Sequence, residues 1–164
     1  MFKLVGCPPP RKGNKNCLTK PNTLRTFYEK FDDFLITSID NETPSGKDFW
    51  AICLNFLPTE VGGCQQKVKK DDQVLFAYST QDVTKHYLKL SGPKIAVIRV
   101  PVVLTVTDGT GTPVSKASVD GHLTDDHGSV SIAFDRVGTQ ELKAERYPDS
   151  VRSNQLVIHV IVGP

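Results

Sequence analysis

The most constraining feature of this sequence is the position of its cysteines. All four lie within the first 64 of the 164 residues, and the remainder of the chain has none. They are Cys7, Cys17, Cys53 and Cys64. An even number of cysteines in a short segment is typical of disulfide-bonded domains that fold in an oxidising compartment. The pattern predicts two disulfide bonds in the front of the chain, each contributing about 2–4 kcal/mol, and an extracellular or cell-wall location.

The chain divides into two parts near Ser91-Gly92-Pro93, where glycine and proline interrupt it. Before this point cysteines and aromatic residues accompany mixed structure. After it, short alternating strands and turn signals follow one another. The sequence therefore predicts a front domain over residues 1–91 and a back domain over residues 92–164.

The front domain reads as an α+β domain. Apolar residues from Leu24 to Phe31 recur at roughly helical spacing, with Asn22 or Thr23 available as the N-cap, and this predicts one helix. Strands are expected at 34–39, 49–57 and 74–78, and residues 86–90 are expected to finish the domain. The predicted domain is a small β-grasp-like sheet with one helix.

The back domain reads as all β. Short strands are expected at 95–100, 102–107, 117–119, 129–134, 140–144 and 156–161. Turn signals such as Asp108-Gly109 and Asp125–Gly128 separate them. Short strands at regular intervals of about 8–12 residues are typical of a β-sandwich, so an immunoglobulin-like sandwich is expected.

Residues 24–78 resemble the domain related to the C-terminal part of transcobalamin and intrinsic factor, which recurs in bacterial and fungal surface proteins. The motifs that carry the resemblance are Phe31–Ile39, Phe49–Phe56, Val61-Gly62-Gly63-Cys64 and Val68–Tyr78. The chain departs from the family pattern at Asp71, where glycine is usual; aspartate tolerates similar turn geometry.

The resemblance bears on cysteine pairing. Local pairing would join Cys7 to Cys17 and Cys53 to Cys64. The family instead implies that an N-terminal cysteine bonds Cys64 and that the remaining one meets Cys53. It also makes cobalamin a conceivable ligand, although that family shares its ligand site with a large helical domain that this chain lacks.

Residues 93–164 resemble the immunoglobulin-like modules of surface and adhesin proteins. The segments that carry this second resemblance are Val102–Asp108, Gly111–Val114, Thr124–Gly128, Val137–Ala144 and Arg152–Asn154, together with Ala117. The two domains in this order resemble a secreted fungal family of unassigned activity. Such sandwiches host many functions, so the resemblance implies a fold and a surface location only.

Four aromatic residues are the candidates for ligand binding: Trp50, Phe49, Phe56 and Tyr78. Their default role is the core of an apolar strand. The functional alternative is stacking on a sugar or a corrin ring. Asn41-Glu42-Thr43 is a glycosylation sequon, which makes Asn41 a candidate modification site.

No catalytic pattern stands out. The histidines lack metal-ligand spacing, and the paired aspartates Asp32-Asp33 and Asp71-Asp72 are adjacent, so they cannot face each other across a cleft. There is no nucleophile-elbow motif and no phosphate-binding loop. The sequence predicts no enzymatic activity, no metal and no cofactor.

Charge and hydropathy limit the partners. A net charge of +2 with interspersed signs does not suit nucleic-acid binding, and no apolar stretch approaches the roughly 20 residues of a membrane span.

The short start before Cys7 suggests that a leader is missing. The expected function is a monomeric, non-enzymatic secreted or cell-surface module for recognition, adhesion or spacing, with an unidentified surface, protein or carbohydrate partner. The alternatives are a cobalamin- or carbohydrate-binding protein and a secreted fungal effector.

Overall fold

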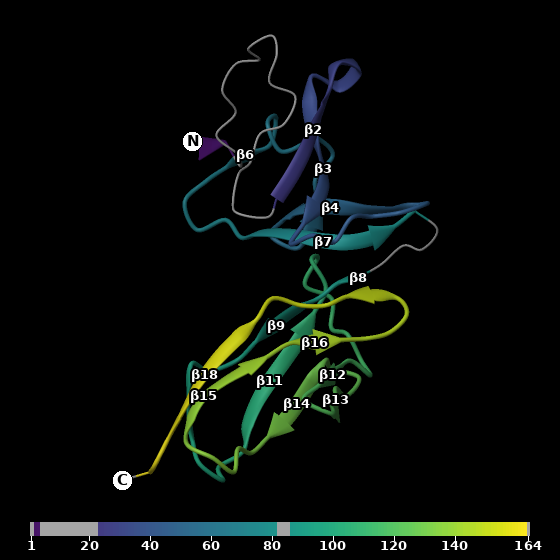
Figure 1. The fold of residues 1–164 in the computed structure, drawn as a ribbon. Coiled ribbons are helices and arrows are strands. Elements are labelled where there is room, and N and C mark those ends of the chain that lie inside the picture. Colours follow the sequence, from purple (N-terminus) through teal and green to yellow (C-terminus); the bar gives the residue numbers. More distant parts are fainter. Residues whose placement is uncertain (1, 4–22, 82–85, 164) are drawn as a thin grey trace. The chain divides into compact units, whose positions relative to one another are not determined.

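The structure is a computed structural model that describes residues 2–3, 23–81 and 86–163 (Figure 1). It is mostly β, built from several small sheets that are largely antiparallel. The chain forms two compact units, Met1–Thr84 and Lys85–Pro164, called unit 1 and unit 2 below. Each unit is described by itself.

The helix predicted near the start of unit 1 is wrong. Thr23–Tyr28 forms strand β2, which pairs antiparallel with β3 (Asp33–Ile39). Only Glu29–Phe31 winds into a short 3₁₀ helix, η1, and Asp32 ends it in the left-handed conformation with φ 48°. The described residues contain no α-helix, so the front domain is all β there rather than α+β.

Local composition explains why a strand forms here. Thr23, Thr26, Phe27 and Tyr28 belong to the β-branched and aromatic types that strands favour. A register shift between Leu24 and Arg25 alters the regular alternation of faces. The spacing of apolar residues from Leu24 to Phe31 therefore resembles that of a helix, but pairing with β3 makes Thr23–Tyr28 a strand.

The second sheet of unit 1 has the order β5-β4-β7. Its strands are β4 (Asp48–Leu54), β5 (Leu57–Pro58) and β7 (Val74–Thr80). Asn55 and Phe56 both have positive φ, 52° and 67°, as a two-residue hairpin turn requires. A further short pair joins β1 (Phe2–Lys3) to β6 (Lys67–Val68). The strands predicted at 34–39 and 74–78 are confirmed, and β4 and β5 occupy most of the run at 49–57.

The turn before β7 has the expected geometry. Asp71, where the family resemblance expects glycine, has φ 72° and so adopts the left-handed conformation. Asp72 accepts hydrogen bonds from the Asn55 side chain at 2.9 Å and from the Lys69 N–H at 2.7 Å. The Asn55 hydrogen bond, followed by the Lys69 one, lowers the pKa of Asp72. These contacts join the 69–72 turn to the β4–β5 turn.

Unit 2 consists of short strands in small sheets (Figure 1). One sheet has the order β14-β11-β9, from Ser129–Ile132, Val102–Thr107 and Lys89–Ser91. Another has the order β10-β18-β15, from Ile95–Val97, Leu156–Ile161 and Gly138–Leu142. A third has the order β13-β12-β16, from His122–Leu123, Ser118–Val119 and Ala144–Glu145. Finally, β8 (His86–Tyr87) pairs with β17 (Ser150–Val151).

The division between the units falls earlier than the sequence suggests. It lies between Thr84 and Lys85, ahead of β8 and β9. Strand β9 pairs with β11, in the register Ser91 to Thr105 through Lys89 to Thr107. Residues 86–91, expected to close the front domain, are therefore the first strands of unit 2.

The two units have different cores. In unit 2 one apolar cluster includes the fully buried Leu88, Leu104, Val106, Val119 and Ile158. The buried apolar residues of unit 1 are fewer and mostly small. In the part of unit 1 that the structure describes, they are Ile36, Ala51, Cys53, Phe56 and Ala77. The described part of unit 1 thus buries much less apolar surface, which is the situation in which disulfide bonds matter most.

Candidate functional site

A cavity of about 360 Å³ opens beside the β2–β3 hairpin of unit 1. Its lining combines aromatic and aliphatic side chains with a few polar groups. The lining residues are Tyr28, Phe31, Asp33, Phe34, Leu35, Glu60, Val61, Gly62 and Gln65. This volume lies within the range of about 300–1,000 Å³ that is usual for small-molecule sites.

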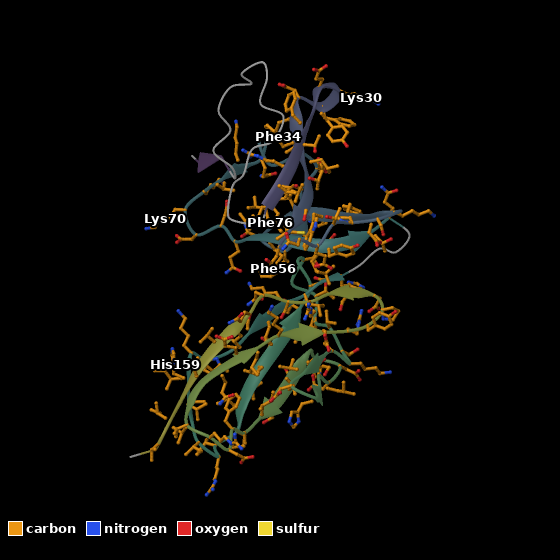
Figure 2. The ribbon with its side chains drawn as sticks, viewed as in Figure 1. Lys30, Phe34, Phe56, Lys70, Phe76 and His159 are labelled. Atoms are coloured by element: carbon orange, nitrogen blue, oxygen red, sulfur yellow. The ribbon has the colours of Figure 1, made fainter. Side chains whose placement is uncertain are left out.

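The hairpin supplies one wall of the cavity. Tyr28 and Asp33 are register partners at the end of the β2–β3 ladder, and the η1 turn carries Phe31 between them. Figure 2 shows Lys30 at the tip of this hairpin and Phe34 further along it. Tyr28, Phe31 and Leu35 remain exposed although they are large and apolar, so this wall offers apolar surface to a ligand.

The segment after β5 supplies the other wall and is fixed at several points. The Thr59 N–H donates to the Ile52 carbonyl oxygen at 2.9 Å, and its hydroxyl lies within hydrogen-bond distance of the carbonyl oxygens of Ile52 and Val61, at 3.1 and 2.8 Å. The Gln65 side chain donates to the Phe31 carbonyl oxygen at 2.8 Å. These bonds tie the segment to β4 and to the hairpin, so the cavity is preformed.

Asp33 is the buried polar group of the cavity wall. Asp33 is only 4% exposed. Its Oδ1 atom accepts hydrogen bonds from the Phe34 N–H at 2.7 Å and from the Cys64 N–H at 3.1 Å. Oδ2 has no hydrogen-bond partner among the described residues. A buried acceptor left without a donor costs about 1–3 kcal/mol, so half of this carboxyl group is held and half is unsatisfied.

Gly62 allows this arrangement. A Cβ atom at position 62 would lie 2.4 Å from both Cγ and Oδ2 of Asp33. Any side chain there would have to displace the carboxyl group. The close approach of backbone to carboxyl group therefore depends on glycine.

Charged groups of both signs lie at the lining. Among the described residues, the charged members of the lining itself, Asp33 and Glu60, are acidic. Two basic side chains lie against aromatic rings of the lining: the Arg25 guanidinium carbon is 4.5 Å from the Phe34 ring centroid, and Lys30 Nζ is 5.5 Å from that of Phe31. The cavity thus combines aromatic rings with two carboxyl groups, and two cations lie against the same rings.

The structure brings together only two of the four predicted aromatic residues. Trp50 and Tyr78 are cross-strand partners on β4 and β7, with ring centroids 5.4 Å apart and nearly perpendicular planes. Phe49 points to the opposite face of the sheet because successive side chains alternate, and Phe56 is buried in the β4–β5 turn at 5% exposure. None of the four lines the cavity.

The polar atoms of the Trp50–Tyr78 pair are engaged within unit 1. Trp50 Nε1 donates to the Glu42 carbonyl oxygen at 3.1 Å, and the Tyr78 hydroxyl donates to Asp48 Oδ2 at 3.1 Å. Burial, together with the Asp48 hydrogen bond, raises the pKa of Tyr78. The pair therefore has a clear structural role in joining β4 to β7.

The remaining predicted positions are dispersed. Asn41 is exposed in the turn after β3, with φ 65°, and its glycosylation stays a prediction. Cys53 is buried in β4 and is not disulfide-bonded to Cys64, so the local pairing of these two is not formed. Cys7 and Cys17 lie outside the described residues, and the other pairings stay predictions.

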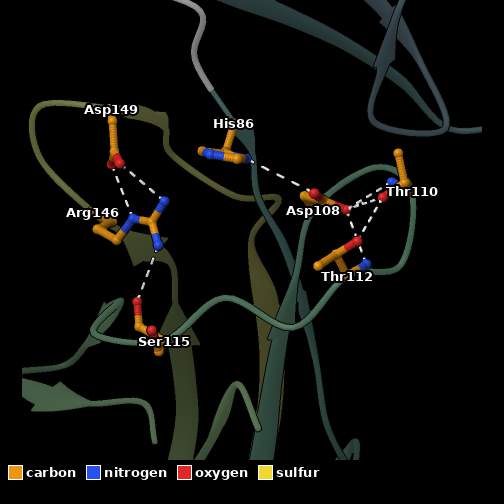
Figure 3. Close-up of polar contacts among 7 residues, drawn as sticks. All are labelled: His86, Asp108, Thr110, Thr112, Ser115, Arg146 and Asp149. Atoms are coloured by element: carbon orange, nitrogen blue, oxygen red, sulfur yellow. Dashed lines mark hydrogen bonds and ion pairs between the residues drawn. The ribbon is translucent and has the colours of Figure 1, made fainter. Parts of the chain in front are cut away.

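Unit 2 holds a set of polar contacts around Asp108 (Figure 3). Oδ1 accepts hydrogen bonds from the Thr110 N–H, the Thr110 hydroxyl and the Thr112 N–H, at 2.9, 2.7 and 3.0 Å. His86 Nδ1 lies 3.8 Å from Oδ2. Burial raises the pKa of Asp108, but the hydrogen bonds and His86 outweigh it, so the net pKa is lowered. This carboxyl group organises a turn.

Two further carboxyl groups in unit 2 serve nearby turns. Asp149 receives two hydrogen bonds from Arg146, whose third contact is the Ser115 carbonyl oxygen (Figure 3). The Arg146 hydrogen bond lowers the pKa of Asp149. Asp125 Oδ1 accepts the N–H groups of His127 and Ser129, which confirms that the Asp125–Gly128 segment is a turn.

Among the described residues, no three His, Cys, Asp or Glu side chains gather where they could hold a metal ion. No helix in the described part is long and apolar enough to cross a membrane. Comparison with protein-family models, with curated proteins and with solved structures finds no match for this chain.

Sequence reasoning missed the cavity residues. In the sequence, Asp33 is one of two adjacent carboxylates and part of the Phe31–Ile39 motif, and Gly62 is part of the 61–64 turn motif. Their meeting depends on a contact between residues 31 positions apart, the Cys64 N–H and Asp33 Oδ1. The sequence signal is an aspartate directly before the strand predicted at 34–39.

Proposed function

We propose that this chain is a non-enzymatic recognition module in which unit 1 binds a small ligand in the cavity beside the β2–β3 hairpin. The observation that carries the proposal is the cavity itself, with its aromatic lining and its buried, half-satisfied Asp33. Preformed cavities of this size, mostly apolar with a few placed polar groups, are typical of ligand sites.

The proposal includes a location outside the cell. Its support is the concentration of four cysteines in the first 64 residues, in the unit with the smaller core, because such domains depend on disulfide bonds in oxidising compartments. The adhesion and effector roles expected from the sequence remain compatible with a ligand-binding module.

For unit 2 we propose an immunoglobulin-like sandwich, and for unit 1 a relationship to the transcobalamin C-terminal domain. The two sheets β14-β11-β9 and β10-β18-β15 contribute side chains to one apolar cluster, which supports the sandwich assignment. Unit 2 would then serve as the rigid domain that carries unit 1 on a surface.

An NMR titration tests the proposed function. The full chain, labelled with ¹⁵N, is titrated with 2-phenylethanol, a neutral aromatic probe. We expect saturable chemical-shift changes confined to residues 28–35 and 60–65, with a dissociation constant on the order of 1 mM for so small a probe. Shifts that do not saturate, or that centre on Trp50 and Tyr78, would contradict the proposal.

A cavity-filling variant provides the control. Val61→Trp places a large ring in the lining and should abolish the saturable shifts. Val137→Trp makes the same change at an exposed position of unit 2 and should leave them unchanged.

A further inference from the structure

We propose that strand β7 of unit 1 is a self-association surface, through which two copies of this chain pair their β7 strands antiparallel about Ala77. In this arrangement the two β5-β4-β7 sheets form one continuous sheet across a twofold axis. The inference departs from the monomer expected from the sequence. It also goes beyond the proposed function, because none of the described residues that line the cavity belongs to β7.

The first observation is that β7 lies at an open edge of its sheet. In the part of the chain that the structure describes, β4 is the strand that pairs with β7. At one end of this ladder the Asn55 N–H donates to the Gln73 carbonyl oxygen at 2.8 Å. At the other end the Gln81 N–H donates to the Lys47 carbonyl oxygen at 3.1 Å.

These two end bonds fix which backbone groups of β7 face β4. Hydrogen-bonded and non-hydrogen-bonded pairs alternate along an antiparallel ladder, so the odd-numbered residues of β7 are the ones bonded to β4. The N–H and C=O groups of the even-numbered residues point to the open edge, where a further strand can bond to them. These residues are Val74, Phe76, Tyr78 and Thr80.

The second observation is that this edge lacks the features that keep sheet edges apart. Edge strands are usually protected by charged side chains, proline, bulges or short length. Strand β7 runs over the seven residues Val74–Thr80 without a charged residue or a proline, and its ladder with β4 has no register shift.

The other edges in the described part of unit 1 are protected. Among the described edge strands of six residues or more, β2 contains Arg25 and β3 contains Asp33. The opposite edge of the β5-β4-β7 sheet is β5, which is two residues long and ends in Pro58. Strand β7 is therefore the edge most open to pairing.

The third observation is that β7 is complementary to itself. Antiparallel pairing about Ala77 places even-numbered residues opposite even-numbered ones, so the outward N–H and C=O groups of the two copies meet as hydrogen-bonded pairs. Phe76 of each copy lies opposite Tyr78 of the other, and Val74 of each lies opposite Thr80 of the other. An axis at Ala77, the middle residue of β7, pairs the strand over its whole length.

The side chains at these positions favour the contact. Phe76 and Val74 are 38% and 37% exposed, and pairing covers part of this apolar surface. Trp50 and Tyr78 already form a cross-strand aromatic pair within unit 1, with ring centroids 5.4 Å apart. Phe76 projects from the same face of β7 as Tyr78, so a Phe76–Tyr78 pair between copies continues this aromatic row. Such pairs stabilise sheets, and no like charges meet.

Sedimentation equilibrium of the full chain over about 1–500 µM tests the inference. Because the pairing of two edge strands makes a small interface, we expect a reversible dimer with a dissociation constant on the order of 10–100 µM. The mass of a single chain throughout this range would overturn the inference.

A matched pair of variants locates the contact. Phe76→Lys places a charge on the edge strand and should raise the dissociation constant of the dimer about tenfold or more. Leu57→Lys adds a charge at an exposed residue of β5, on the opposite edge of the same sheet, and should change it less than about twofold. Equal effects of the two substitutions, or no effect of Phe76→Lys, would overturn the assignment to β7.

Amide hydrogen exchange of the unmodified chain, followed by NMR at low and high protein concentration, needs no variant to fold. We expect exchange to slow with concentration at the even-numbered residues of β7, and to change little at Leu75, Ala77 and Ser79, which already face β4. Slowing without this alternation would overturn the pairing even if a dimer forms. A chain that stays monomeric but binds 2-phenylethanol would overturn this inference and leave the proposed function intact.

Discussion

Asp33 and Gly62 are the two residues on which the cavity wall depends. The carboxyl group of Asp33 joins the start of β3 to the Cys64 N–H, and Gly62 makes room for it. The same contact that holds the loop leaves Oδ2 without a donor. Oδ1 therefore anchors the loop, while Oδ2 is buried without a hydrogen-bond partner among the described residues.

Gly62→Ala should destabilise unit 1 by about 2 kcal/mol, because the new Cβ overlaps the Asp33 carboxyl group. Trp50 is the only tryptophan in the chain, so its fluorescence in a urea titration reports unit 1. In an Asp33→Ala background the same substitution should cost much less, since the overlap is gone. Equal costs in both backgrounds would show that the overlap does not determine stability.

Asp108 should make unit 2 sensitive to acid. Its pKa is lowered in the folded state, so its stabilising contribution is complete above the ordinary aspartate pKa of about 4 and is lost as pH falls through the lower, folded value. Asp108→Asn should cost about 1 kcal/mol at neutral pH and reduce the loss of stability between neutral and acidic pH.

Thermal unfolding followed by circular dichroism at several pH values measures this effect. Asp126→Asn, at an exposed carboxyl group of another turn, is the control and should change neither quantity. An unaltered acid response in the Asp108 variant would contradict the assignment.

At the scale of elements, the β4–β7 pair is the best-defined structure of unit 1. Its ladder runs without a register shift from Asp48 opposite Thr80 to Leu54 opposite Val74. The Trp50–Tyr78 contact lies within it, and the Tyr78 hydroxyl reaches back to Asp48. These aromatic residues account for sheet pairing without a ligand.

Tyr78→Phe should lower the urea midpoint of unit 1, because it removes the hydrogen bond to Asp48 and keeps the ring. Urea denaturation monitored by Trp50 fluorescence measures it. Tyr28→Phe, which removes a hydroxyl group from an exposed tyrosine, should change the unfolding free energy by less than about 0.5 kcal/mol. If the two variants behave alike, the Tyr78 hydrogen bond does not contribute.

The longer strands of unit 2, such as β11 and β18, could be predicted from sequence, and strand β2 could not. The two-residue strands β13 and β17 were not predicted, and β8 and β9 were expected in the front domain. The run of apolar and β-branched residues in Val102–Thr107 fits only a strand. In the structure its buried residues, Leu104 and Val106, alternate with less buried neighbours. From Leu24 to Phe31 the apolar spacing fits a helix equally well, and only pairing with β3 decides it.

The cavity was beyond sequence reasoning for a related reason. Asp33 and Gly62 lie in motifs of the family resemblance, but neither belongs to a ligand-binding motif, and each has an ordinary local interpretation as a turn-flanking residue. Their role arises from a contact between distant parts of the chain. Periodicity and spacing report local structure, so they could suggest the aromatic strand residues but not the site that the fold assembles elsewhere.

At the scale of the whole molecule, the two units differ in how they are stabilised. Unit 2 has a contiguous apolar cluster and no cysteine. Unit 1 has all four cysteines and a small core in its described part. We therefore expect a reducing agent to affect the two units differently.

Treatment with dithiothreitol should destabilise unit 1 by about 2–4 kcal/mol for each disulfide bond lost. A urea titration followed by Trp50 fluorescence should show this shift. Backbone amide signals of unit 2 in the same titration should keep their midpoint. An unchanged Trp50 midpoint would contradict the predicted disulfide bonds and with them the main support for an extracellular location.

The central claim is that a small ligand occupies the cavity beside the β2–β3 hairpin. An isotope-filtered NOESY experiment on the ¹³C-labelled full chain with unlabelled 2-phenylethanol tests it most directly. We predict contacts from the ring protons of the probe to the methyl groups of Leu35 and Val61, which line the cavity. Contacts to Ile52 and Leu54 on the Trp50 face of the β4–β7 sheet, without contacts to Leu35 or Val61, would contradict it.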